Sequence, residues 1–174
     1  MKIDFYRRNI VYAGITLLFL AVASCKINYT LSGASYSPDT QTFSVSFFQN
    51  QAPLINPALS NTFTEALKDR ISSQTKLKLK ESNGDIQYEG TITNYQVSTQ
   101  SISGNETASL NRLTITVNVK FTNTKTPAQN FEKSFTQFAD YESTKSLNMV
   151  EDDLVKEISD KLTSDIFTAS LVNW

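Results

Sequence analysis

Residues 113–121 alternate strictly between apolar and polar side chains, and this pattern limits the folds open to the chain. The apolar parity holds Leu113, Ile115, Val117, Val119 and Phe121, and the polar parity holds Arg112, Thr114, Thr116, Asn118 and Lys120. In a β-strand these two sets point to opposite faces. We therefore predict a sheet with one face in a core and the other face polar.

Four other segments are predicted to form strands. Residues 42–48 and 77–80 alternate in the same way, and residues 86–98 and 130–139 are longer. In residues 86–98 the apolar residues change from even to odd positions. In a regular strand Ile92 and Tyr95 would therefore point to opposite faces. A β-bulge near Thr93 and Asn94 would restore one buried face. In the last segment Phe131 and Phe135 are in register and Phe138 is not.

Two segments carry apolar residues at the three- and four-residue spacing of an amphipathic helix. The first stripe is Leu59, Phe63, Ala66, Leu67 and Ile71, and the second is Val150, Leu154, Ile158, Leu162 and Ile166. Asn56-Pro57 predicts the first helix start, since asparagine caps well and proline fits the first turn. The second helix is predicted to begin at Ser146 or Asn148, with Glu151 completing a capping box in the latter case.

These elements predict an α+β fold: a two-layer sandwich with a mainly antiparallel sheet of about four strands. Short turns link the longer strands, which favours antiparallel pairing. Each helix has one apolar stripe, so both helices are expected on the apolar face of the sheet. The other face would be uncovered and rich in hydroxyl and amide side chains: Ser44, Ser46, Thr91, Thr93, Thr114, Thr116 and Asn118.

The N-terminal residues have the pattern of an export signal. Lys2, Arg7 and Arg8 precede an apolar run at residues 10–22, which is short for a membrane-spanning helix. The run ends at Val22-Ala23-Ser24-Cys25, which resembles the lipobox of bacterial lipoproteins. We therefore expect a signal peptide at residues 1–24, a tether at 25–41 that begins at a lipidated Cys25, and a folded domain at 42–174. Acyl chains such as palmitate would anchor the protein. The alternative is an ordinary signal that happens to contain a cysteine.

Composition excludes several classes of function. The chain has no histidine and one cysteine, so Ser-His and Cys-His nucleophilic systems and most zinc sites are excluded, and we expect no metal and no cofactor. After residue 24 the net charge is near −3, which argues against a nucleic-acid partner. An envelope enzyme would have to use paired carboxylates, Asp152 with Asp153 or Glu81 with Asp85. Helix-dipole compensation and turn hydrogen bonds explain these pairs better, so we expect no catalytic residues.

The order of elements also resembles a known family. The resemblance is carried by the lipobox, Gly33-Ala34-Ser35, Phe47-Phe48-Gln49-Asn50, a proline-started helix, Asn111-Arg112-Leu113, a phenylalanine-rich strand and a long C-terminal helix. Together they resemble the LptE family of lipopolysaccharide-assembly lipoproteins, in its Bacteroidota-type form.

The resemblance implies a plug and assembly partner of an LptD-type outer-membrane β-barrel, in a 1:1 complex. Thr114, Thr116 and Asn118 would face this partner, and Arg112, Lys120 and Lys133 are candidates for contact with lipopolysaccharide. No aspartate follows Cys25, which by resemblance to lipoprotein sorting rules favours the periplasmic side of the outer membrane. The loop at residues 101–109 is a second candidate contact. The alternative function is a pilotin-like or lipid-binding lipoprotein serving another outer-membrane assembly.

Overall fold

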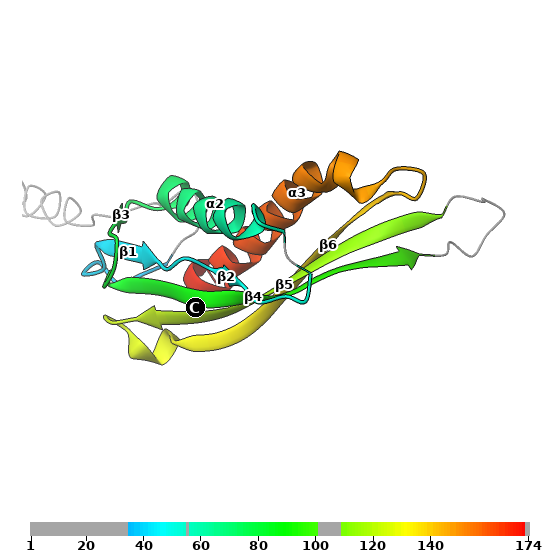
Figure 1. Ribbon diagram of the computed structural model, residues 1–174. Helices are drawn as coiled ribbons and strands as arrows, with labels where there is room; N and C mark the ends of the chain where they lie inside the picture. The colour runs from blue at the N-terminus through cyan, green and yellow to red at the C-terminus, as the bar shows by residue number, and fades with distance from the viewer. Residues whose placement is uncertain (1–34, 55, 101–108, 173–174) are drawn as a thin grey trace, which may run out of the picture. The chain divides into compact units, whose positions relative to one another are not determined.

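Two helices cover one face of a β-sheet in this protein (Figure 1). The computed structural model describes residues 35–54, 56–100 and 109–172, all within the compact unit Leu31–Trp174. The predicted two-layer α+β fold is confirmed. The predicted signal peptide, the lipidated Cys25, the first part of the tether and most of the loop at 101–109 lie outside the described residues.

The sheet is mixed and larger than predicted. Its strands are β1 (Thr42–Val45), β2 (Gln49–Asn50), β3 (Lys78–Leu79), β4 (Ile86–Gln100), β5 (Leu110–Asn123) and β6 (Phe131–Glu142). They lie in the order β3-β1-β4-β5-β6, and β2 also pairs with β4. The three long strands are antiparallel as predicted, whereas β1 pairs in parallel with both β3 and β4. The sheet thus has six strands instead of about four.

The helices are α2 (Leu59–Gln74) and α3 (Leu147–Phe167). Helix α2 connects β1 to the parallel strand β3 and lies over that side of the sheet, while α3 lies over β5 and β6. A π-helical turn, η3 (Thr168–Val172), continues α3, and a short 3-10 turn, η2 (Pro127–Gln129), joins β5 to β6.

The predicted bulge in β4 is confirmed. Ile92 pairs with Val117 and Asn94 pairs with Thr116, so Thr93 is the extra residue. The bulge places Tyr95 on the helix side, where only 4% of its surface is exposed.

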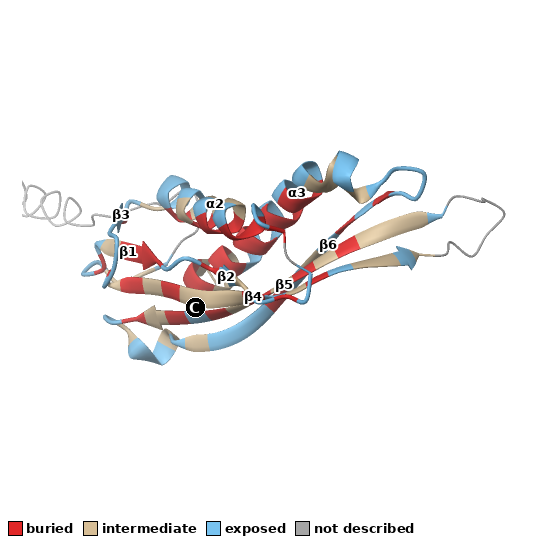
Figure 2. Ribbon diagram, in the orientation of Figure 1, coloured by how far each residue is buried: buried red, intermediate tan, exposed pale blue. Residues whose placement is uncertain are grey.

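The core fills the space between the helices and the sheet (Figure 2). The apolar parity of β5 supplies its centre, with Leu113, Ile115, Val117 and Val119 fully buried. Apart from the partly buried Ala66 and Val150, both helical stripes are buried in the same core, on the side of the sheet that the alternation predicted.

Both helices begin near the predicted residues. Helix α2 begins at Leu59 with Ala58 as its N-cap, two residues after the predicted cap Asn56. The Asn56 side chain still accepts hydrogen bonds from the backbone N–H groups of Ala58 and Leu59, at 2.8 and 3.0 Å, in the turn that leads into the helix. Helix α3 starts after Ser146, and the capping box with Glu151 is wrong. The Glu151 carboxylate instead accepts hydrogen bonds from the Asn56 amide and the Tyr95 hydroxyl. Glu151 therefore ties the start of α2, α3 and β4 together.

Asp85 joins β1 to the start of β4. One carboxylate oxygen accepts hydrogen bonds from the backbone N–H groups of Gln41 and Thr42 and from the Thr42 hydroxyl, at 2.8–3.0 Å. These bonds, led by that from Gln41 and helped by the nearby Lys125 ammonium, outweigh partial burial and lower the pKa of Asp85 to about 2. The carboxylate is thus held in its ionised form.

Replacing Asp85 with asparagine should lower the free energy of unfolding by about 1–2 kcal/mol at neutral pH. The pKa of Asp85 is lowered on folding, so its stabilisation is present above the unfolded value of 3.8 and is lost as the pH falls toward 2. Urea unfolding followed by circular dichroism would measure this. The difference between wild type and D85N should shrink between pH 4 and pH 2, and the exposed D153N control should change stability by less than about 0.5 kcal/mol. An equal difference at both pH values would contradict the ionic role.

Candidate partner-binding face

The face of the sheet opposite the helices is polar and largely uncharged at its centre. Cross-strand pairing aligns residues of β4, β5 and β6 in rows along this face. We call the following set the polar face: Thr91, Asn94, Gln96, Thr114, Thr116, Asn118, Ser134 and Thr136. Among these, the predicted partner-facing residues Thr114, Thr116 and Asn118 lie side by side on β5, the middle strand of the three.

Hydrogen bonds between side chains order the middle of the polar face. The hydroxyl groups of Thr116 and Thr136 lie 2.9 Å apart, and the Asn118 amide donates to Glu132 at 3.1 Å. These groups remain accessible to solvent. Such hydroxyl and amide groups can exchange water for a polar partner at lower cost than charged groups can.

One residue predicted on this face is covered instead. Ser44 is buried, with 6% of its surface exposed, and its hydroxyl accepts a hydrogen bond from the Gly84 backbone N–H at 3.1 Å. The turn before β4 covers it. Thr93 is the extra residue of the bulge, and its hydroxyl donates to the Thr116 carbonyl at 3.4 Å.

An ion pair lies near each end of the polar face. The Arg112 guanidinium donates two hydrogen bonds to the Asp140 carboxylate, at 2.7 and 2.8 Å, and lies 3.7 Å above the Phe138 ring. This pairing raises the pKa of Arg112 and lowers the pKa of Asp140. Toward the other end, the Lys120 ammonium lies 3.2 Å from the Glu89 carboxylate. Eight positions separate Arg112 from Lys120, a span of about 27 Å along a strand.

The three basic residues predicted to contact lipopolysaccharide do not form one site. Arg112 and Lys120 are on the polar side of the sheet but at opposite ends. Lys133 is on the helix side of the edge strand β6, opposite Val119, with its ammonium 5.3 Å from the Phe135 ring centre.

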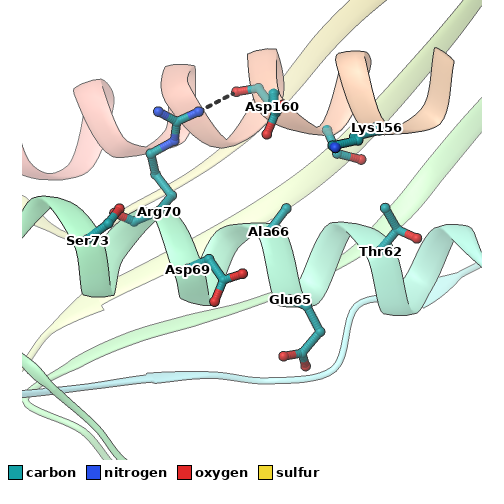
Figure 3. Close-up of a pocket in the computed structure, with 9 residues that line it drawn as sticks. Thr62, Glu65, Ala66, Asp69, Arg70, Ser73, Lys156 and Asp160 are labelled. Atoms are coloured by element: carbon teal, nitrogen blue, oxygen red, sulfur yellow. Dashed lines mark hydrogen bonds between the residues drawn. The ribbon is translucent and has the colours of Figure 1, made fainter. Parts of the chain in front are cut away.

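A groove between the outer surfaces of α2 and α3 was not predicted (Figure 3). It has a volume of about 500 Å³, and its lining includes Glu65, Asp69 and Lys156. The Arg70 guanidinium crosses it and donates to the Asp160 carbonyl at 3.2 Å. The charged lining does not suit a lipid acyl chain, which argues against lipid carriage in this groove.

The carboxylate pairs weighed for catalysis do not form catalytic constellations. Asp152 and Asp153 are exposed on α3. Asp85 is held ionised by its hydrogen bonds to the start of β1, which does not suit a general acid. Within the described ranges, no three acidic, cysteine or histidine side chains gather as metal ligands, and no helix is long and apolar enough to cross a membrane.

These features define an α+β domain with one polar, uncovered sheet face. The sequence model of the LptE family, described as lipopolysaccharide-assembly, matches residues 40–170. The chain therefore belongs to the LptE family. It is a family of non-catalytic lipoproteins, and membership suggests a role in lipopolysaccharide assembly and a lipid-anchored, envelope-associated location.

The chain is similar to solved lipoprotein structures at low identity. A minor lipoprotein from Acinetobacter baumannii is 20% identical over 74% of this chain and 90% of that one, with a TM-score of 0.47. Lipoprotein B from Nitrosomonas europaea is 13% identical over 83% and 88%, with a TM-score of 0.49. No curated protein matches the chain significantly.

Proposed function

We propose that this protein is an outer-membrane lipoprotein that acts as plug and assembly partner of an LptD-type β-barrel, in a 1:1 complex and in the Bacteroidota-type form of the family. In this role it helps the barrel assemble and pass lipopolysaccharide to the cell surface. The observation that carries the proposal is the family match over residues 40–170, which spans both α-helices and all six strands of the described domain.

The polar face supports this proposal on physical grounds. An antiparallel sheet can leave one face in water, so exposure alone does not require a partner. Here the centre of the face has uncharged hydroxyl and amide groups, with ion pairs near its two ends. The lumen of a large outer-membrane barrel is polar. A lumen wall could therefore replace the water on Thr114, Thr116 and Asn118, none of which is itself charged.

Attachment of the protein to the membrane is proposed to occur through Cys25. Two or more acyl chains at this residue would hold it on the periplasmic side of the outer membrane, because one chain alone binds only reversibly. The lipopolysaccharide contacts of Arg112, Lys120 and Lys133 stay predictions. Of these, Arg112 already has its guanidinium paired with Asp140.

A pilotin-like role for another outer-membrane assembly is the second candidate. It needs the same anchor and the same folded domain, and only the identity of the partner distinguishes it. Purification through a C-terminal tag from cells of the source organism tests both. The proposed function predicts recovery of an LptD-type barrel in equal amount. Recovery of a different outer-membrane protein, or of no barrel, would contradict it.

A further inference from the structure

Three lysines gather on the outermost strand of the sheet, at the edge opposite β6. Lys76, Lys78 and Lys80 occupy alternate positions in and around β3, and all three are exposed. The backbone N–H groups of Lys78 and Lys80 donate to the carbonyls of Gln41 and Phe43, at 2.9 and 2.8 Å, so this segment is extended along β1. We call Lys76, Lys78 and Lys80 the lysine row.

The side chains of the lysine row lie on one face of the sheet, because successive side chains of β3 point to opposite faces. Leu77 is buried, and Leu79 pairs with Phe43 on the helix side of the sheet. Lys78 and Lys80 therefore point to the other side. Leu79 keeps 50% of its surface exposed at the sheet edge, which places an apolar side chain beside the charges.

None of the three lysines forms an ion pair in the part of the chain that the structure describes. Glu81 follows Lys80 directly in the sequence. Asp85 is already bound by the start of β1 and by Lys125, at 3.4 Å. The ammonium groups of the row are therefore available to an external anion.

The lysine row lies at the end of the domain where the tether joins it. The Ser35 backbone N–H donates to the Leu171 carbonyl at 2.6 Å, and the Tyr36 hydroxyl accepts from the Lys76 backbone N–H at 3.4 Å. Ten positions separate Ser35 from Cys25, and such a segment spans at most about 36 Å in any conformation. Lipidation of Cys25 would thus hold the row at high effective concentration next to a bilayer surface.

From this placement we propose that the lysine row binds the anionic phosphate headgroups of the phospholipid bilayer that holds the anchor. A lysine near an anionic membrane surface gains about fivefold in binding, and the effect falls within a Debye length. Leu79 adds apolar contact at the interface. The row would orient the domain on the membrane, a function separate from docking into a barrel. The inference rests on the proposed Cys25 anchor for placement and does not depend on the barrel partner.

The test uses the exported, lipidated protein, diluted from detergent onto vesicles of phosphatidylcholine alone or mixed with phosphatidylglycerol. A water-soluble amine-acylating reagent and mass spectrometry measure the modification rate of each lysine. On the anionic vesicles, acylation of Lys76, Lys78 and Lys80 should slow by about fivefold, and high salt should restore the rate. Lys68, Lys145 and Lys156, which lie on or near the helices, should react equally on both vesicles.

Variants provide a second readout. In the wild-type protein, the rate of backbone amide hydrogen exchange at residues 76–80 should differ between the two vesicle types. Replacing the three lysines of the row with glutamine should abolish this difference. The charge-matched control K68Q/K145Q/K156Q should retain it. Equal acylation rates on both vesicles would overturn the proposal. If acylation of the lysine row slows only when lipopolysaccharide is added, the row does not bind phospholipid and the proposal is wrong.

The failure of this inference can be distinguished from that of the proposed function. The intact mass of the purified protein reports whether Cys25 is acylated, and co-purification reports the barrel. Neither measurement involves the lysine row.

Discussion

T116R should abolish recovery of the barrel partner while the isolated domain stays folded. Thr116 lies in the middle of the polar face, on the central strand of the three, with its hydroxyl 2.9 Å from that of Thr136. An arginine here would place a bulky charge without a partner in an enclosed interface. Such a charge costs several kcal/mol, so we expect partner affinity to fall on the order of 100-fold or more.

The free domain should tolerate the same change. Its polar face is solvated, so the arginine head can extend into water and the free energy of unfolding should change by less than about 0.5 kcal/mol. Co-purification through a C-terminal tag measures the first effect, and urea unfolding measures the second. S72R, at an exposed position of α2, is the control and should retain the barrel. Normal barrel recovery with T116R would show that this face is not the interface.

G90A should destabilise the domain strongly, by about 3 kcal/mol. Gly90 pairs with Val119 in the middle of the β4–β5 ladder. A Cβ atom built on it would overlap the Asn118 carbonyl oxygen and would lie 2.7 Å from Cε1 of Phe48. The carbonyl belongs to the paired strand and the Phe48 ring is fully buried, so neither can move without disturbing the core.

Thermal unfolding followed by circular dichroism checks this expectation. A loss of this size corresponds to a melting temperature lower by about 10 °C for a domain of this length. T91A, one position further along β4 and on the polar face, should lower it by a few degrees at most. An unchanged melting temperature in G90A would mean that the two strands do not approach as closely as the structure shows.

Much of the fold could be predicted because its signals are local. The alternation in β5 sets two faces, and the change of parity between Ile92 and Tyr95 requires the bulge that the structure contains. The Asn56-Pro57 signal is also local, and it predicted the start of α2 to within two residues. The short strand β2 could not be predicted, because two residues, Gln49 and Asn50, carry no periodicity and pair only because β4 is adjacent.

The candidate site was predicted in part, for similar reasons. Thr114, Thr116 and Asn118 follow directly from the parity of one strand. Ser44 was placed wrongly because the turn that covers it lies forty residues away, and its hydrogen bond to Gly84 has no local signal. The position of Lys133 was available from the sequence, since it shares the parity of Phe131 and Phe135 and so must lie on the helix side. The hydrogen bonds of Glu151 could not be predicted from the sequence, because their donors, Tyr95 and Asn56, come from distant segments of the chain.

Photocrosslinking in living cells tests the enclosure of the polar face most directly. A photoreactive amino acid is placed at Thr114 or Thr116, with Ser72 on α2 as the matched position, and the crosslinked species is identified by mass spectrometry. We expect a crosslink to an LptD-type barrel from both threonines, stronger than from Ser72. If the threonines give no crosslink to a barrel in cells where the protein is exported and folded, the polar face is open to solvent and the proposed plug function is wrong.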